Sequence, residues 1–390
     1  MRSTRDAARA FAGYGEAMTP RILSIGTAVP RARLRQDEVR DLFAGQPGAD
    51  RLTKRLIGAA FDASAIETRH TVLDDLAAAA AATALPREGE RMPTVTDTGT
   101  LLAPSTGARN DAYIRLAPPL FAEAARNALA AASVDPAEVT HVVTVSCTGM
   151  FAPGPDYRLV RDLGLPTTVA RSHLGFMGCA AAVPALRTAS QICAAHPDAV
   201  VLVVCAELCS LHVRTPADHD EIVSASVFAD GAAAAVVSAD AARATGATFE
   251  LDRFATVLTD EGEKDMAWTI GDTGFEMILS AEVPRIIGRE IRGAVDSFLG
   301  DDGVETWAVH PGGRSVLDRV ESGLDLPGDA LTVSRDVLRD YGNMSSATIL
   351  FILKALLAAD LADGDRVATL AFGPGLTLEA ARLTFRRADA

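Results

Sequence analysis

The sequence GFMGCA at residues 175–180 places a cysteine, Cys179, between two segments of different periodicity. Residues 168–174 have the pattern of a strand, and residues 180–195 have the spacing of a helix, with Pro184 near its start. A strand-to-helix turn directs backbone N–H groups toward the sulfur, and the helix N-terminus favours the thiolate, the form that attacks a carbonyl carbon. A cysteine before a helix is by itself more often a small core residue, so the choice depends on its partners elsewhere in the chain.

Strands and helices alternate on both sides of this turn. In the first part of the chain we predict strands at 21–26, 141–146, 199–206 and 231–238, and helices at 36–43, 51–60, 76–85, 118–132 and 157–163. In the second part we predict strands at 249–258, 306–309, 366–372 and 377–385, and helices at 283–299, 313–323 and 344–359. Residues 86–109 are rich in Pro, Gly, Thr and Ser and are predicted as a long loop. The alternation with buried strands indicates an α/β fold.

The length of 390 residues predicts two domains or one duplicated unit. We expect an N-terminal arm at residues 1–20, a half carrying the cysteine at 21–240, and a second half at 241–390. The chain has 37 basic and 51 acidic residues, a net charge of −14. Such a surface does not attract nucleic acid or an anionic membrane as a whole, so a polyanionic substrate needs a local basic patch.

The remaining composition predicts a cytoplasmic globular protein. The five cysteines are odd in number and form no CxxC pair, which fits a reducing compartment without a disulfide framework. The sequence has no uninterrupted apolar window of about 18 residues, so no membrane-spanning helix is predicted. The N-terminal residues contain no apolar stretch typical of a secretory signal, and no cluster of metal ligands is evident.

Two downstream motifs supply candidate partners for Cys179. His310, in VHPGG at 309–313, follows a predicted strand, and Asn343 lies in YGNMSS at 341–346, at the start of a predicted apolar helix. The imidazole can stabilise a thiolate and then donate a hydrogen bond to a thioester oxygen. The asparagine can cap the helix, donate from its amide to the same oxygen, or do both. Two neutral donors in a dry pocket can stabilise an enolate without a metal.

Together with FGPGLT at 372–377, these motifs resemble those of the type III polyketide synthases, the plant chalcone-synthase family and its bacterial relatives. The resemblance runs from about residue 21 to the C-terminus. It implies a thiolase-type layered αβαβα fold built from two pseudo-duplicated halves, and a homodimer. It also implies that Cys179 carries the acyl group, with His310 and Asn343 as its partners. Phe228 matches the phenylalanine that separates the coenzyme A tunnel from the cavity.

Further positions define the pocket that the resemblance implies. The expected wall residues, besides Phe228, are Cys147, Thr148, Cys209, His212, Met277 and Ser345. Several of these are similar to bacterial synthases that take long fatty acyl starters and make alkylpyrones or alkylresorcinols. A flexible Met277 in place of a ring can open a channel for an alkyl chain, although ordinary repacking of the core is the alternative.

The basic residues that hold coenzyme A phosphates in plant relatives are not retained. The matching stretch, residues 56–64, is nearly uncharged, and Arg51, Lys54 and Arg55 lie about one helical turn away. Arg314, after the HPGG motif, is a further candidate. This departure leaves room for an acyl carrier protein as the starter donor.

The implied reaction uses acyl-CoA and malonyl-CoA or methylmalonyl-CoA as substrates and needs no other cofactor. The starter loads on Cys179, the extender is decarboxylated under His310 and Asn343, condensation repeats, and the chain cyclises. One alternative is a ketoacyl synthase of the type that starts fatty-acid synthesis, against which the HPGG and GPGLT runs argue. Another is a non-catalytic homologue acting as a binding subunit, against which the intact Cys, His and Asn set argues.

Overall fold

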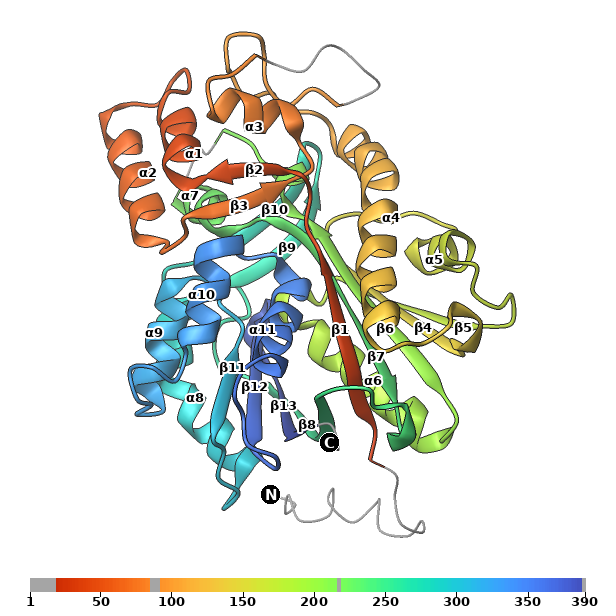
Figure 1. Ribbon diagram of the computed structural model, residues 1–390. Coiled ribbons are helices and arrows are strands. Elements are labelled where there is room, and N and C mark those ends of the chain that lie inside the picture. The colour runs from red at the N-terminus through yellow and green to blue at the C-terminus, as the bar shows by residue number, and fades with distance from the viewer. Residues whose placement is uncertain (1–18, 85–91, 216–218, 388–390) are drawn as a thin grey trace.

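A long mixed β-sheet forms the centre of the protein (Figure 1). The computed structural model describes residues 19–84, 92–215 and 219–387. Within these residues the sheet has nine strands in the order β11-β12-β13-β8-β1-β7-β6-β4-β5. Their bounds are β1 (Arg21–Ala28), β4 (His141–Ser146), β5 (Ala170–Gly175), β6 (Val200–Leu208), β7 (Asp230–Ser238), β8 (Thr248–Leu258), β11 (Thr306–Val309), β12 (Arg366–Gly373) and β13 (Thr377–Arg386).

The pairing of the strands repeats once along the sheet. In the first half β1 pairs antiparallel with β7, β7 antiparallel with β6, and β6 parallel with β4. In the second half β8 pairs antiparallel with β13, β13 antiparallel with β12, and β12 parallel with β11. The halves meet where β1 and β8 pair antiparallel at Ile22 and Phe249. The predicted α/β class is confirmed, and the division into residues 21–240 and 241–390 remains a prediction that this repeat supports.

Helices cover both faces of each half. Alternate residues of β6 point to opposite faces, so that Leu202 packs with α4 (Thr106–Ala131) and Val203 with α6 (Ala182–Ala195). The helices α6 and α11 (Thr348–Leu357) belong to one core cluster, which includes strand residues of both halves, so they form the inner helix layer. The helices α4 and α5 (Pro155–Leu163) belong to another core cluster, on the outer face of the first half. On the second half, α8 (Val283–Leu299) and α9 (Arg314–Gly323) cover the outer face. The result is a layer order of α, β, α, β and α.

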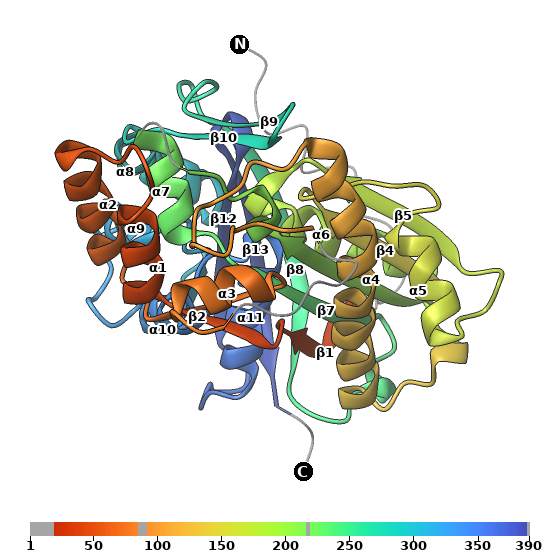
Figure 2. The same cartoon turned by 90° about the horizontal axis from the view of Figure 1, so that it is seen from above.

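Shorter elements gather at one end of this layered body and enclose the cavities described below. Figure 2 shows α1 (Gln36–Ala44), α2 (Arg51–Ala63) and α7 (His219–Val227) on the opposite side from α4 and α5. The other elements are α3 (Asp74–Ala80), α10 (Thr332–Tyr341), the pair β2 (Ala32–Arg35) and β3 (Thr68–Thr71), and the hairpin β9 (Met266–Gly271) and β10 (Gly274–Leu279). Among the described residues, no helix combines the length and the apolar character needed to cross a membrane.

The predicted start of the helix at 118–132 is wrong. The helix α4 begins at Thr106, inside the predicted loop, and Pro118 and Pro119 lie in its interior. Ser105 caps it by accepting a hydrogen bond from the Ala108 N–H. Within its first turn, the buried Arg109 side chain donates to the carbonyl oxygens of Pro104, Leu211 and Val213. Tertiary contacts therefore override the propensity of proline to begin a helix.

Two other predictions fall partly outside the described residues. The helix predicted at 76–85 ends at Ala80, and residues 85–91 are not described. The N-terminal arm predicted at 1–20 falls almost entirely on residues 1–18, which lie outside the description.

The packing of β1 on α4 predicts opposite effects for two glycine substitutions. A Cβ added at Gly26 would lie 2.2 Å from the Ala128 nitrogen, whereas one added at Gly58, inside α2, would meet nothing within 4 Å. We expect Gly26→Ala to lower the free energy of unfolding by about 1–3 kcal/mol, because the helix must move away from the strand. We expect Gly58→Ala to raise it by about 0.5–1 kcal/mol, because alanine loses less backbone entropy in a helix. Urea denaturation followed by circular dichroism measures both, and changes of the same sign would contradict the close packing.

Candidate active site

Cys179 lies in a single 3-10 turn, Gly178–Ala180, between β5 and α6. Gly178 has a φ of +61°, and a Cβ at this position would lie 2.5 Å from Pro374 Cδ. Only glycine therefore fits before the cysteine, both for its backbone conformation and for its close approach to the second half of the chain. The FGPGLT run thus acts as the surface against which the cysteine turn packs.

Asn343 lies beside the sulfur, with its Oδ1 3.8 Å from Cys179 Sγ. Its Nδ2 donates to the Gly312 carbonyl oxygen at 3.2 Å, and its Oδ1 accepts from the Ser345 N–H at 2.8 Å. The amide is therefore oriented by both downstream motifs. The alternative in which Asn343 caps the apolar helix does not hold, because residues 345–347 form a separate 3-10 turn and α11 begins after Ala347.

His310 follows β11 and is buried, with 1% of its surface exposed. Its backbone N–H donates to the Leu370 carbonyl oxygen at 2.8 Å. Among the described residues neither ring nitrogen has a hydrogen-bond partner. Buried polar groups without partners are uncommon in proteins. Because His310 borders the same cavity as Cys179 and Asn343, its free nitrogens are available to a bound molecule.

Burial sets the charge of both groups. It raises the pKa of the Cys179 thiol to about 11, against weaker opposing hydrogen bonds from Ser345 and Asn343. Burial likewise lowers the pKa of His310 to about 3. Burial therefore disfavours the thiolate expected from the turn and the imidazole. It favours a neutral thiol and a neutral imidazole in this cavity, because either charge alone would be poorly solvated there.

The sequence analysis missed the buried carboxylate of Glu207, at the end of β6. It accepts hydrogen bonds from the Cys147 N–H at 3.0 Å, the Thr148 hydroxyl at 2.9 Å and the Ser346 hydroxyl at 2.6 Å. Burial raises the pKa of Glu207, although these donors favour its ionised form. A single acidic residue in the apolar run VVLVVCAEL was the available signal, because carboxylates are rarely buried without a specific set of donors.

Two cavities open on either side of Cys179. The first has a volume of about 340 Å³, and its walls include all the predicted pocket residues, namely Phe228, Cys147, Thr148, Cys209, His212, Met277 and Ser345. The second has a volume of about 370 Å³ and is bordered by His310 and Asn343. Phe228 and Met277 border both cavities, so they lie at the boundary between them.

His212 is held as part of the wall of the first cavity. Its Nε2 lies 2.8 Å from the Thr148 carbonyl oxygen, and its Nδ1 accepts from the Phe275 N–H at 3.0 Å. This arrangement fixes one neutral tautomer, and burial lowers the pKa of the ring to about 3. The ring stacks on Phe275 at 4.2 Å and meets the edge of Trp268 at 5.5 Å. The hairpin β9–β10 therefore supplies two aromatic wall residues that the sequence analysis missed.

Apolar side chains make up part of the wall of the first cavity. Leu34, Val39, Phe43 and Leu76, from β2, α1 and α3, border it, and Arg69, Arg214 and Glu221 border it as well. The four apolar side chains offer no polar group to a bound molecule, so they suit contact with a hydrocarbon chain.

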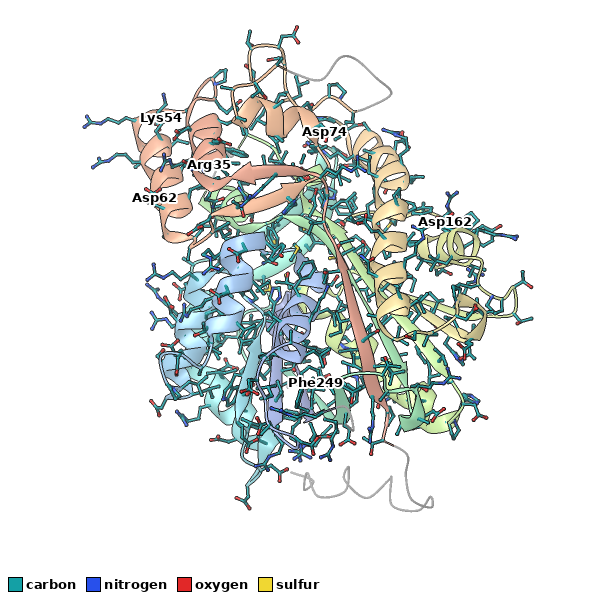
Figure 3. All side chains as sticks on the ribbon, in the orientation of Figure 1. Arg35, Lys54, Asp62, Asp74, Asp162 and Phe249 are labelled. Carbon is teal, nitrogen blue, oxygen red and sulfur yellow. The ribbon has the colours of Figure 1, made fainter. Side chains whose placement is uncertain are left out.

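Of the four predicted coenzyme A cations, only Arg314 borders a cavity. Arg51, Lys54 and Arg55 lie near the start of α2 and border neither one. Figure 3 shows Lys54 on the outer side of α2, at the margin of the molecule. The second cavity instead has Arg285 and Arg319 at its border together with Arg314. Within the described ranges, no group of three or more His, Cys, Asp or Glu side chains is placed to hold a metal ion.

The chain matches known proteins over most of its length. Residues 4–241 match the family model for the N-terminal domain of chalcone and stilbene synthases, and residues 250–385 match that for the C-terminal domain. A curated relative, "Probable polyketide synthase 1" of Dictyostelium discoideum, is 29% identical over 371 residues. That match covers 92% of this chain but only 11% of the relative, so the chain corresponds to a small part of that protein.

Two solved structures share the fold. The structure of PKS-I from the brown alga Ectocarpus siliculosus has a TM-score of 0.86 and 29% identity, and the match covers 95% of this chain and 98% of that one. The C-terminal type III polyketide synthase domain of Steely1, a type I/III hybrid from Dictyostelium, has a TM-score of 0.83 and 28% identity, with 94% and 99% covered. Both matches confirm the predicted thiolase-like layered fold. The chain therefore belongs to the chalcone and stilbene synthase family, the type III polyketide synthases, whose members are acyltransferases that carry out Claisen condensations.

Proposed function

We propose that this chain is an iterative type III polyketide synthase that loads an acyl-CoA starter on Cys179. It extends the starter with malonyl-CoA or methylmalonyl-CoA and cyclises the chain to an alkylpyrone or alkylresorcinol. The observation that carries the proposal is the position of Cys179 between two cavities. One cavity has the polar groups His310 and Asn343, and the other includes the apolar side chains Leu34, Val39, Phe43 and Leu76 in its wall.

Loading is a thioester exchange. Cys179 Sγ forms a bond to the acyl carbon, the bond from that carbon to the coenzyme A sulfur breaks, and the thiol proton passes through His310 to the departing thiolate. Burial keeps the His310 ring neutral, so one of its nitrogens is free to accept the proton. Transfer of the proton from Cys179 to His310 leaves the net charge of the cavity unchanged, so no single uncompensated charge is buried.

Extension begins with decarboxylation of the extender. The bond between its carboxylate and its α-carbon breaks, CO₂ leaves, and the electron pair forms an enolate with negative charge on the thioester oxygen. The neutral His310 ring and the second Nδ2 proton of Asn343 can donate to that oxygen, since the first Nδ2 proton is directed at Gly312. The α-carbon then attacks the acyl carbon on Cys179 and releases its sulfur. One such donor typically contributes about 10²–10³ in rate.

A medium or long fatty acyl starter is favoured by the first cavity. Cys179 borders it at one side, and Leu34, Val39, Phe43 and Leu76 border its apolar part. A ketoacyl synthase that performs one condensation is the second candidate within the same fold. The two cavities that Cys179 borders favour iteration, because the growing chain and the extender thioester can occupy different cavities at the same time.

We also propose a homodimer. The edge strand β5 leaves most of its side chains exposed and has one free backbone edge in the described sheet. An unpaired edge of this kind can pair with the same strand of a second copy, which gives a closed two-fold contact. An acyl carrier protein remains a possible starter donor in this proposal, in addition to coenzyme A.

The acyl-enzyme tests the proposal directly. We expect incubation with acyl-CoA starters from acetyl to stearoyl to add one acyl mass to the protein, with the adduct on Cys179 and the highest occupancy for the longer chains. Intact mass spectrometry followed by peptide mapping measures both. Cys179→Ala should abolish the adduct, and the matched control Cys209→Ala, in the same cavity wall, should retain it. An adduct on Cys147 or Cys209 in the wild-type protein, or none at all, would contradict the assignment of the nucleophile.

The pH dependence of alkylation tests the role of His310. Only the thiolate reacts with iodoacetamide, so the rate follows the readiness with which the thiol loses its proton. Because the pKa of Cys179 in the intact protein is raised to about 11 and His310 is kept neutral, we expect the wild-type rate to rise about tenfold per pH unit between pH 7 and 10. His310→Gln should give the same slope, because a neutral imidazole adds no charge that stabilises the thiolate. A wild-type profile that is flatter and faster at pH 7 than that of His310→Gln would show that the imidazole holds the thiolate, and would contradict the neutral pair.

A further inference from the structure

Arginines from two helices border the second cavity and a groove that continues from it. Arg285 on α8 and Arg314 and Arg319 on α9 border the cavity that also contains Cys179, His310 and Asn343. Arg285 and Arg319, together with Arg289, border the adjoining groove of about 440 Å³ between the two helices. Because Arg285 and Arg319 border both, the cavity and the groove adjoin at these two arginines.

Arg319 is the central cation of this site. Among the described residues it has no acidic partner, and its Cδ lies 3.4 Å from the position that a Cβ would take at Gly288 of α8. The absence of a side chain at Gly288 leaves space for the arginine to cross from α9 onto α8. Its guanidinium group therefore has unused donors at the entrance of the groove.

The other arginines have acidic neighbours, but only in exposed pairs. Arg285 binds Glu282 at 2.5 Å, Arg289 binds Glu261 at 2.5 Å, and Arg314 lies 3.5 Å from Asp318. Each of these arginines is about half exposed or more. Exposed ion pairs contribute little to stability, about 0–1 kcal/mol, so a phosphate can replace the carboxylate at low cost. Guanidinium groups match phosphate oxygens in a bidentate geometry.

Apart from its arginines, the wall of the second cavity is largely uncharged. Leu279, Val283, Val316 and Phe372 border it. Such walls suit the uncharged pantetheine arm of a coenzyme A thioester, whose charges lie at its phosphate end. On a chain with a net charge of −14, a polyanion needs a local concentration of cations, and these four arginines supply it.

We infer that the phosphates of the coenzyme A substrate bind at Arg319, with Arg285, Arg289 and Arg314, in the groove between α8 and α9. They do not bind at Arg51, Lys54 and Arg55 of α2. This inference rests on the proposed function, because it assigns the phosphate site for the same thioester substrates. It relocates the site from α2, where the family resemblance placed it, to α8 and α9.

Binding of coenzyme A itself tests this site independently of turnover. We expect isothermal titration calorimetry to show that Arg319→Ala weakens coenzyme A binding about 5–10-fold and that adding Arg285→Ala weakens it further. The matched control Lys54→Ala, an exposed cation of α2, should leave the affinity within about two-fold. Unchanged affinity in Arg319→Ala, or a loss in Lys54→Ala of the same size, would overturn the inference.

Kinetics with two malonyl donors, one with phosphates and one without, test whether the effect of Arg319→Ala depends on the phosphates. For malonyl-CoA, Arg319→Ala should raise KM by about the same 5–10-fold with little change in kcat. For malonyl-N-acetylcysteamine, which has no phosphate, KM should not change. An equal effect on both donors would assign Arg319 a structural role and overturn the inference. If the wild-type protein turns over neither donor, the proposed function fails, while the calorimetry still decides the phosphate site.

A third experiment distinguishes coenzyme A from a carrier protein as the donor that binds at the arginines. A carrier protein presents the same pantetheine arm with one phosphate, whereas coenzyme A also has a 3′-phosphate and a second phosphate in its diphosphate. We expect Arg319→Ala to weaken binding of coenzyme A more than that of dephospho-coenzyme A. A variant that loses activity only with a malonyl carrier protein, and keeps its KM for malonyl-CoA, would assign the cluster to carrier-protein docking and contradict the inference.

Discussion

One buried carboxylate, Glu207, holds the walls of the site in place. A buried carboxylate is tolerated only where donors surround it, so the groups that donate to Glu207 have little freedom to move. They come from both halves of the chain: Cys147 and Thr148 follow β4, and Ser346 belongs to the turn before α11. That turn includes Ser345, whose φ of +48° is unusual for a residue other than glycine and is maintained by these surroundings. Since the Ser345 N–H fixes the Asn343 amide, the carboxylate also determines where Asn343 lies relative to Cys179.

The same burial that orders the site makes its chemistry depend on neutral groups. A dry cavity disfavours a resting thiolate and a resting imidazolium, as the shifted pKa values of Cys179 and His310 show. It also strengthens each hydrogen bond to a charge that appears only during the reaction. The site is therefore poorly suited to storing charge and well suited to stabilising an enolate. In the proposed mechanism the proton moves within the Cys179–His310 pair, which satisfies both conditions.

The sequence predicts most of the framework and the reactive residues, because both depend on local pattern. The strand at 306–309 and the helix at 283–299 have the predicted bounds, since each is a periodic apolar segment with clear ends. The start of α4 and the hairpin β9–β10 were not predicted, because they depend on Arg109 and on contacts with His212 that are distant in sequence. The arginines Arg285 and Arg319 at the border of the second cavity were not predicted for the same reason. Spacing along α2 does not show which of its residues border a cavity, whereas Arg319 borders it from α9 and packs beside Gly288 of α8.

The number of extender units added to each starter decides whether the synthase is iterative. Turnover with isotopically labelled malonyl-CoA and an unlabelled fatty acyl-CoA can be followed by product mass and by released CO₂. An iterative synthase with separate cavities for chain and extender predicts products that contain two or more labelled units per starter, with one CO₂ released for each. A single labelled unit under all conditions would contradict iteration and assign the chain to single-condensation chemistry within the same fold.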